Sequence, residues 1–326
     1  MKVCVFGAGA VGGNVATRLL AAQAADISIV ARGATLQAIR ERGLTLHSLG
    51  REYTARPKVA TDDPAMLPPQ DLVISTVKGY RLPAIADTLA RLIAPQGCAL
   101  FMLNGIPWWW RHGLPGVSGP LPLVDPQGTL WTKLTPQKAL GCVVGSPNEV
   151  TAPGVILNIG ANRYIMGEPD GSLSARLNAA VELFRRSGIE AQASTDIRRE
   201  IWRKLSTNAY SNPLTALTRL GLAEIGAEPE LCQLAATVMR ETVAVAAALG
   251  WDLRSEVDPE KISMHAGRQP GVRSSMLQDV VLKRPLEVES HLGQIQAFAR
   301  EVGVAVPAID VIVPLLRGLD RALRAS

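Results

Sequence analysis

The chain has 326 residues, too many for one ordinary hydrophobic core, so its length predicts two domains. Hydrophobic residues make up 47% and charged residues 19%, proportions close to globular averages that exclude a disordered or collagen-like chain. The formal net charge is +5, and Lys and Arg are dispersed along the chain rather than gathered in basic blocks. This pattern favours small anionic ligands over nucleic acid.

No apolar run reaches the roughly 20 residues that cross a bilayer, and the start of the chain lacks the parts of a signal peptide, so we expect no membrane association. The cysteines and histidines show no CxxC, no HExxH and no other metal-ligand spacing. We therefore predict a reduced, cytoplasmic protein without a metal site. The cysteines are Cys4, Cys98, Cys142 and Cys232, and the histidines are His47, His112, His265 and His291.

The first 195 or so residues alternate short runs rich in Val and Ile with amphipathic stretches, the pattern of βαβ units on a parallel sheet. The predicted strands are Val3–Phe6, Ile27–Ala31, Leu72–Val77, Ala99–Leu103, Leu140–Val144, Val155–Ile159 and Tyr164–Gly167. The predicted helices are 11–23, 33–43, 81–94 and 173–187. The later strands lie close together, with a turn at Ala152-Pro-Gly154, which indicates antiparallel pairing there.

After about residue 195 the strand signals disappear and long stretches rich in Ala, Leu, Arg and Glu predict an all-helical region. The predicted helices are 196–211, 214–224, 228–249, 274–282, 285–302 and 307–323. Between them, Gly250–Arg273 contains Pro259 and Pro270 and predicts a looser crossing between helices.

A glycine-rich segment, Gly7-Ala8-Gly9-Ala10-Val11-Gly12, follows the first strand and opens the first helix, the context that a GxGxxG motif requires. Its glycines permit a tight turn and close approach of the backbone to a pyrophosphate, and the helix N-terminus offers free N–H groups. Flavin and S-adenosylmethionine proteins share similar loops, so the motif by itself predicts a dinucleotide or another nucleotide and no more. The expected fold class is α/β: a Rossmann-type dinucleotide-binding domain over residues 1–195, followed by an all-helical substrate and catalytic domain over 196–326.

Polar residues follow three of the predicted strands, where open α/β sheets bind their ligands. Arg32 ends the second strand, at the position where an NAD enzyme usually has an acidic residue, and its guanidinium suits the 2'-phosphate of NADP. The alternative is a solvated Arg that opens the next helix and leaves the cofactor preference undecided. Lys78 and Asn104 follow two other strands, and each is either a contact of the bound cofactor or an ordinary surface residue.

The first helix of the second region carries Lys204, Asn208 and Asn212 at i, i+4 and i+8, which aligns them on one stripe. A merely solvated face would more naturally use Glu, Lys and Arg, because Asn has poorer helix propensity. The stripe is therefore interpreted either as a hydrogen-bonding wall of a site or as a polar face packed across the domain boundary.

Over nearly its full length the chain resembles the ketopantoate reductase family. The resemblance rests on several motifs in the right order: Gly7–Gly12, Asn104-Gly105, Trp202-Arg-Lys204-Leu, Asn208, Asn212-Pro-Leu-Thr-Ala216, Ser274-Ser-Met-Leu-Gln-Asp279 and Leu286-Glu287-Val. It implies a Rossmann-type first domain, an all-helical second domain, and a cleft that holds NADPH and 2-dehydropantoate, a small anionic 2-oxo acid. A homodimer stays open, since one chain gives no view of an interface.

The resemblance also implies roles for individual residues. Lys204 would be the proton donor, and Glu287 a partner of the substrate hydroxyls that helps to orient Lys204 or the substrate. Asn208 and Asn212 would be polar anchors, and Ser275 and Asn104 would contact the substrate carboxylate. Arg32 and Lys78 match positions that contact NADPH in the family. A cationic donor suits this chemistry, because hydride addition to a keto carbon builds negative charge on its oxygen.

One segment departs from the family pattern, since Asn104-Gly105 is followed by Ile-Pro-Trp108-Trp109-Trp110. These tryptophans either wall the substrate site, cover the cofactor, form a partner surface or simply pack an inserted loop. Two rival functions stay open: a reductase of another 2-oxo or 3-oxo acid, such as a β-hydroxyacid dehydrogenase with a similar Lys, and a non-catalytic NADPH-binding sensor.

Overall fold

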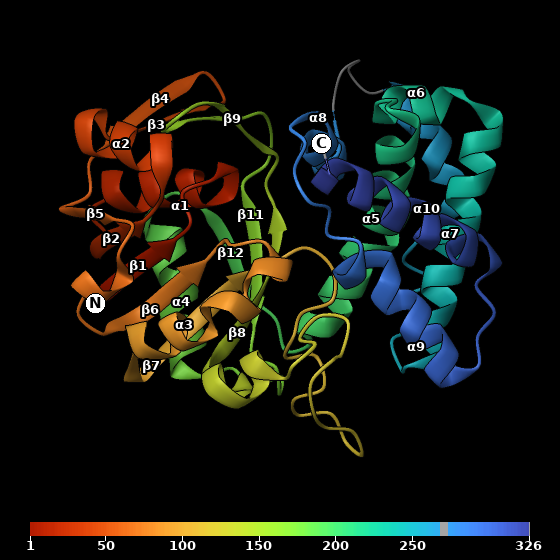
Figure 1. Cartoon of the computed structure of the whole chain (residues 1–326), viewed down its shortest axis with the longest axis horizontal. Coiled ribbons are helices and arrows are strands. Elements are labelled where there is room, and N and C mark those ends of the chain that lie inside the picture. The colour runs from red at the N-terminus through yellow and green to blue at the C-terminus, as the bar shows by residue number, and fades with distance from the viewer. Residues whose placement is uncertain (268–272, 326) are drawn as a thin grey trace. The chain divides into compact units, whose positions relative to one another are not determined.

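The computed structural model describes residues 1–267 and 273–325, and the chain divides into two compact units (Figure 1). The first unit comprises Met1–Leu103 and Pro107–Arg198, and the second comprises Asn104–Ile106 and Arg199–Ser326. Asn104–Ile106 therefore groups with the second unit, although its neighbours in the sequence belong to the first. The fold is the predicted α/β class, a Rossmann-type sheet unit and a helical unit.

The first unit is built on an eight-stranded sheet of order β12-β11-β8-β7-β6-β1-β2-β5. From β5 to β8 all neighbours pair in parallel, and β11 pairs antiparallel with β8, so both predicted modes of pairing are confirmed. The strand order reverses at β1, which pairs with β2 on one side and β6 on the other. The strands are β1 (Lys2–Phe6), β2 (Asp26–Val30), β5 (Val59–Thr61), β6 (Gln70–Ser75), β7 (Ile93–Met102), β8 (Ala139–Gly145), β11 (Arg163–Gly167) and β12 (Glu190–Ala193).

A second, four-stranded sheet of order β4-β3-β10-β9 packs against helix α1 (Ala10–Ala21). Its strands are β3 (Leu44–Ser48), β4 (Arg51–Ala55), β9 (Asn148–Ala152) and β10 (Val155–Asn158). Only β10 was predicted. The other three strands lack a continuous apolar run: β3 alternates buried and partly buried residues, and β4 and β9 are mostly exposed. The predicted turn joins β9 to β10 as an antiparallel hairpin with Gly154 at a φ of +78°.

The remaining helices of the first unit are α2 (Gly33–Arg42), α3 (Ala86–Leu92) and α4 (Ala175–Arg186), with short helical turns at Pro64–Met66, Gly79–Arg81, Pro83–Ile85, Leu130–Leu134 and Pro136–Lys138. The predicted helix over 81–94 was therefore too long at both ends, since α3 begins at Ala86 and β7 follows it from Ile93. At its start Pro83 opens a separate 3₁₀ turn, since proline suits a first helical position but lacks the N–H that a helix interior needs.

A buried polar network joins α1 to the second sheet. Asn14 on α1 is fully buried and donates to Ser146 Oγ at 3.2 Å and to Asn148 Oδ1 at 2.7 Å. Arg18, also buried, donates to Asn14 Oδ1 at 3.0 Å and to Ser48 Oγ at 2.8 Å. Because the buried side chains of Asn14 and Arg18 have hydrogen-bond partners, they attach α1 to the second sheet without a large desolvation penalty.

The second unit is helical, as predicted (Figure 1). Its elements are α5 (Ile197–Thr218), α6 (Leu222–Ala227), α7 (Pro229–Ala248), η6 (Pro259–Gly267), α8 (Ser275–Val281), η7 (Glu289–Gly293), α9 (Gln294–Val302) and α10 (Pro307–Ala325). Here η6 is a 3₁₀ helix and η7 is a π-helical segment with a kink at His291. The predicted helix over 285–302 thus begins later, and Pro270 of the predicted crossing lies outside the described residues.

The prediction of a helix break near Pro213 was wrong, because α5 runs through this proline. Asn212 and Leu214 on either side are 3% exposed. Burial of both flanks in the helical unit outweighs the local signal, since most helical stability in proteins comes from tertiary packing. One continuous helix therefore carries Lys204, Asn208 and Asn212.

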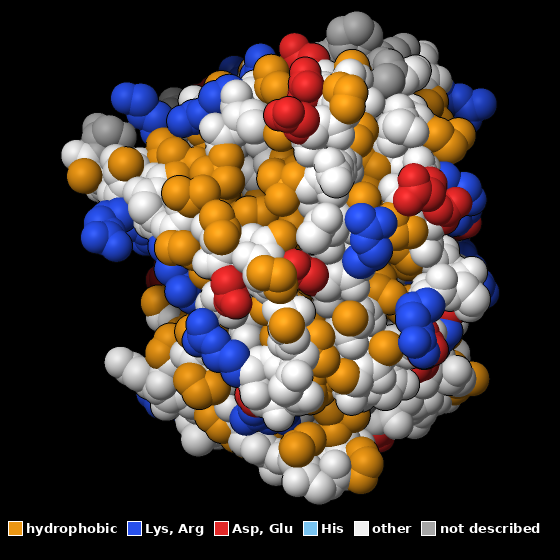
Figure 2. Space-filling view, turned by 90° about the vertical axis from the view of Figure 1, so that its right-hand side faces the viewer, with side chains coloured by type: hydrophobic (Ala, Val, Ile, Leu, Met, Phe, Trp, Pro, Cys, Tyr) orange, Lys and Arg blue, Asp and Glu red, His pale blue; other side chains and the backbone are white. Residues whose placement is uncertain are grey.

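Among the helices that the structure describes, only α7 is long and apolar enough to cross a membrane by length and composition, with a mean hydropathy of 1.2 over its most apolar window. Half of that window is buried, and α7 packs against α6, α9 and α10, as a core helix does. On the face shown in Figure 2, hydrophobic side chains lie interspersed with charged ones.

Candidate functional site

The glycine loop between β1 and α1 is anchored to three parallel strands of the first unit. The Gly7 amide donates to the Val30 carbonyl of β2 at 2.9 Å. Thr76, just after β6, donates its hydroxyl to the Gly7 carbonyl at 2.7 Å. The loop therefore lies at the carboxyl ends of β1, β2 and β6, where the strand order reverses and open α/β sheets bind nucleotides.

The glycines of this loop differ in what surrounds them. A Cβ on Gly12 would lie 1.9 Å from the Gly7 carbonyl oxygen, so Gly12 permits the close packing of helix against loop. Gly7 has a φ of +104°, which a residue with a side chain rarely adopts. A Cβ on Gly9 would meet no protein atom within 4 Å. The space beside Gly9 is thus open, as a loop that lets a pyrophosphate approach its backbone requires.

The N-terminus of α1 suits a phosphate. Gly9 is its N-cap and supplies no side-chain cap, and α1 has no acidic residue in its first turn. The first amides of α1 and the positive end of its dipole therefore meet no competing carboxylate from this turn. Together with the open space at Gly9, these features fit a dinucleotide.

Arg32 and Lys78 lie at the same edge of the sheet. Arg32 directly follows β2 as the N-cap residue of α2, and its side chain is exposed. Lys78 follows β6 as the N-cap residue of the turn Gly79–Arg81 and is partly exposed. The structure thus brings the glycine loop, Arg32 and Lys78 to the carboxyl ends of neighbouring strands, as the sequence predicted.

The second unit carries the polar residues named from the sequence, and two pairs of them are in contact. The Lys204 ammonium on α5 donates a hydrogen bond to Asn104 Oδ1 at 2.6 Å, although the two residues are 100 positions apart. Asn208, one turn further along α5, is partly exposed like Lys204. Ser275, the first residue of α8, donates to Asn212 Oδ1 at 3.4 Å. We call Asn104, Lys204, Asn208, Asn212 and Ser275 the Lys204 cluster.

Two residues that the sequence did not single out hold the Asn104 segment against the helical unit. The Ile106 amide donates to the Ser290 carbonyl at 2.6 Å. A Cβ on Gly105, which has a φ of +79°, would lie 2.2 Å from the same carbonyl oxygen. Gly105 is thus required by packing, because any larger residue at 105 would displace this segment and with it Asn104.

His291 lies on the π-helical segment η7, and Glu287 lies just before this segment. Glu287 is buried, with 7% of its surface exposed, and not the ordinary exposed carboxylate that a Glu usually is. His291 is 1% exposed; its Nδ1 lies 2.9 Å from the Glu287 carbonyl, and its Nε2 lies 3.5 Å from Asn212 Nδ2. His291 was considered in the sequence only as a metal ligand, and no periodic signal places it beside Asn212.

The three consecutive tryptophans belong to the core of the first unit. Trp108, Trp109 and Trp110 are each at most 1% exposed. Trp108 packs edge-on against Phe101 at 5.5 Å between ring centroids. A Cβ on Gly141 would lie 2.6 Å from Trp109. Of the interpretations open from the sequence, this burial favours packing of an inserted loop.

Arg198 completes this packing. Its guanidinium lies 5.6 Å from the ring centroids of Trp109 and Trp110 and donates to three carbonyls, including that of Trp110 at 2.8 Å. Burial lowers the pKa of Arg198 to about 10, so that the group is still charged at neutral pH. The charge is satisfied by carbonyl dipoles and aromatic faces.

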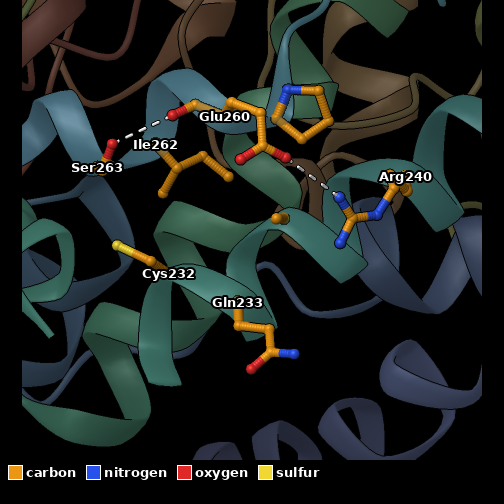
Figure 3. A pocket seen from close by; sticks show the side chains of 8 residues that line it. Cys232, Gln233, Arg240, Glu260, Ile262 and Ser263 are labelled. Carbon is orange, nitrogen blue, oxygen red and sulfur yellow. Dashed lines mark hydrogen bonds and ion pairs between the residues drawn. The ribbon is translucent and has the colours of Figure 1, made fainter. Parts of the chain in front are cut away.

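A separate pocket of about 250 Å³ lies in the helical unit between α7 and η6 (Figure 3). It is lined by Cys232, Gln233, Ala236, Arg240, Pro259, Glu260, Ile262 and Ser263. Arg240 faces Glu260 at 3.8 Å, and the Cys232 thiol donates to two carbonyls of α6. Desolvation raises the pKa of Cys232, so the thiol is a poor nucleophile, and the pocket includes none of the residues of the Lys204 cluster.

The sheet unit, with a nucleotide-compatible loop at its switch point, and the helical unit, with a lysine-centred polar cluster, define a dinucleotide-binding oxidoreductase class. Two family models, described as ketopantoate reductase PanE/ApbA and its C-terminal region, match residues 3–107 and 196–320. A 2-dehydropantoate 2-reductase from Mesorhizobium japonicum is 38% identical over 98% of each chain.

Solved structures agree with this relationship. A crystal structure from Ralstonia solanacearum, assigned as a ketopantoate reductase, has a TM-score of 0.90 and 36% identity over 99% of this chain and 98% of that one. D-mandelate dehydrogenase with NADH shares the fold, with a TM-score of 0.79 and 22% identity over 99% of this chain and 100% of that one. The chain belongs to the ketopantoate reductase family and is an oxidoreductase that acts on a keto group, with a nicotinamide dinucleotide as cofactor.

Proposed function

We propose that the chain reduces 2-dehydropantoate to pantoate with NADPH, in pantothenate biosynthesis, and that Lys204 donates the proton. The observation that carries this proposal is the 2.6 Å contact between the Lys204 ammonium and Asn104 Oδ1. It holds a cationic donor in place within a partly buried polar cluster, in a chain 38% identical to a 2-dehydropantoate 2-reductase.

The nicotinamide supplies the hydride when the cofactor is bound. The chain's own residues manage the charge that this transfer creates. Negative charge develops on the keto oxygen, and a fixed ammonium stabilises it and then gives up its proton. Asn104 accepts a hydrogen bond from Lys204 and so orients the ammonium.

The other predicted contacts complete the substrate assignment. Asn208 and Ser275 are partly exposed and offer neutral hydrogen bonds to a carboxylate or hydroxyl. Glu287, buried beside η7, is assigned to the substrate hydroxyls. Asn212 is 3% exposed, so we assign it to holding Ser275 rather than to broad contact with the substrate.

The assignment of NADPH rests on Arg32, Lys78 and the glycine loop. The glycine loop receives the pyrophosphate, and the exposed Arg32 guanidinium at the end of β2 receives the 2'-phosphate. Lys78 adds a second cation at the same edge. We keep a homodimer and a cytoplasmic location as predictions; a dimeric ketopantoate reductase from Staphylococcus aureus shares the fold.

The test is a substrate profile of the purified enzyme. Oxidation of NADPH is followed with 2-dehydropantoate, 2-oxoisovalerate and phenylglyoxylate, and each assay is repeated with NADH. The highest kcat/KM is expected for 2-dehydropantoate with NADPH. A higher kcat/KM for one of the other acids would make that acid the substrate. Equal kcat/KM with NADH and NADPH would contradict the proposed contact of Arg32 with the 2'-phosphate. NADPH binding without turnover of any keto acid would favour a sensor.

A further inference from the structure

His291 is a buried polar side chain for which the proposed reaction has no role. It lies at the kink of η7, and its ring touches groups from two other parts of the helical unit. Its Nδ1 lies 2.9 Å from the Glu287 carbonyl oxygen, and its Nε2 lies 3.5 Å from Asn212 Nδ2 on α5. A ring so placed, at 1% exposure, connects the segment of Glu287 to a residue of the Lys204 cluster.

The contacts determine which nitrogen of the neutral ring carries the proton. A carbonyl oxygen only accepts hydrogen bonds, so Nδ1 must be protonated to bond to Glu287. Nε2 then carries a lone pair and accepts. This tautomer follows from the hydrogen-bond partners and is inferred in the same way for other buried histidines.

The tautomer in turn determines the orientation of the Asn212 amide. With Nε2 as acceptor, the NH₂ group of Asn212 faces His291, and its Oδ1 faces away, toward the Ser275 hydroxyl at 3.4 Å. If the amide were reversed, its oxygen would face a lone pair and its NH₂ would face Ser275. One ring thus selects between two orientations of Asn212 that differ in what they offer to Ser275.

The same segment also supports the lysine side of the cluster. The Ser290 carbonyl, adjacent to His291, accepts from the Ile106 amide at 2.6 Å. This bond holds the short segment whose first residue, Asn104, accepts from Lys204 at 2.6 Å. Ser290 therefore contacts the segment that carries Asn104, and His291 contacts Asn212 of the Lys204 cluster.

We propose that His291 is a positioning residue for the substrate: its ring fixes the orientation of the Asn212 amide and, through it, of the Ser275 hydroxyl. The proposal rests on the proposed function only in taking Ser275 as a contact of the keto acid. His291 itself touches neither substrate nor cofactor in this scheme, so its replacement acts on KM for the keto acid more than on kcat.

The experiment compares His291→Gln with His291→Leu. Gln places an amide oxygen near the position of Nε2 and still accepts from Asn212, whereas Leu fills similar space without a polar atom. We measure KM for the keto acid, kcat, the Kd of NADPH and Tm. His291→Leu is expected to raise KM about tenfold, the worth of one to two neutral hydrogen bonds, with the Kd of NADPH unchanged. His291→Gln is expected to restore most of the wild-type KM.

A double-mutant cycle separates positioning from general loss of stability. In an Asn212→Ala background, His291→Leu should cause no further rise in KM, because the amide that it orients is gone. Additive effects on KM would overturn the proposal. Equal KM values for the Gln and Leu variants, with the rise in KM matching the loss of Tm, would also overturn the proposal.

If His291→Leu does not fold, His291→Asn takes its place. Asn keeps a donor for the Glu287 carbonyl but has no acceptor at the position of Nε2, so it should raise KM where Gln does not. Equal KM values for Asn and Gln would contradict the proposal. KM and kcat of every variant are compared with those of the wild type, using whichever 2-oxo acid the wild-type enzyme reduces best. If the wild type does not reduce 2-dehydropantoate, the proposed substrate is wrong, but the role of His291 is still tested with the other acid.

Discussion

The glycine loop of the first unit and the Lys204 cluster of the second are built in opposite ways. The loop is contiguous, from Gly7 to Gly12, and offers backbone N–H groups and the open space beside Gly9. The cluster is made of side chains from three separate segments: Asn104 follows β7, Lys204 lies on α5, and Ser275 begins α8. The loop depends on local geometry and the cluster on tertiary packing.

The difference has a consequence for mutation. Loss of one side chain from the cluster removes a chemical group while the helices that carry it stay packed. A side chain added to the loop either occupies the ligand's space or collides with backbone, depending on the position. The two regions should therefore respond to substitution with different combinations of kcat, cofactor affinity and stability.

The largest expected effect is on the cluster. Lys204→Ala should lower kcat by about 10² to 10⁴, the usual worth of general acid catalysis, while NADPH still binds. The measurements are single-turnover reduction and the Kd of NADPH by fluorescence. Lys261→Ala, which removes an exposed lysine of the same unit, is the matched control and should leave kcat unchanged. An unchanged kcat for Lys204→Ala would remove this residue from the mechanism.

The tryptophan segment lies outside both regions and should affect stability alone. Trp109 is 1% exposed and packs on Gly141, so Trp109→Ala should lower the free energy of unfolding by about 3 to 5 kcal/mol. Denaturant unfolding measures this, with Trp251→Ala, a partly exposed tryptophan of the helical unit, as control. If Trp109→Ala kept its stability but changed the preference among 2-oxo acids, Trp109 would instead be a residue of the substrate site.

The order of the main elements could be predicted from the sequence because their signals are local. Buried strands such as β1 and β6 are continuous apolar runs, and the glycine motif lies between a strand and a helix. The second sheet was missed, since β3, β4 and β9 have partly exposed faces and become strands by pairing with each other or with β10. The pairing of β3 with β10 joins Thr45 to Val155, 110 positions away in the sequence, and such a long-range pairing leaves little periodic trace.

The candidate site was predicted unevenly for the same reason. The spacing of Lys204, Asn208 and Asn212 placed them on one helix face, but the partnership of Lys204 with Asn104 depends on tertiary structure. His291 lies in a π-helical segment, where the usual helical spacing does not apply. Burial of Trp108, Trp109 and Trp110 could not be told from an exposed aromatic surface, because three consecutive residues show no period.

A matched pair of substitutions tests the loop. Gly9→Ala should weaken NADPH binding about tenfold to hundredfold, the worth of one lost charge-assisted hydrogen bond, with Tm unchanged, because its Cβ meets no protein atom within 4 Å. Gly12→Ala should lower Tm as well, since its Cβ would lie 1.9 Å from the Gly7 carbonyl oxygen. Titration calorimetry and thermal unfolding separate the two outcomes. Full NADPH affinity in Gly9→Ala would mean that the pyrophosphate lies elsewhere.

The smallest expected effect concerns the choice between NADPH and NADH. Arg32→Glu should weaken NADPH about tenfold more than NADH, because a carboxylate at the end of β2 repels the 2'-phosphate that the guanidinium attracts. Arg32 is exposed, so the difference should shrink as ionic strength rises. Arg42→Glu, at the opposite end of α2, makes the same charge change farther from the loop. It should not change the affinity for NADPH relative to NADH. Equal weakening of both cofactors by Arg32→Glu would show that this residue contacts a part common to both, and the preference for NADPH would then have to come from Lys78 or another cation at the same edge.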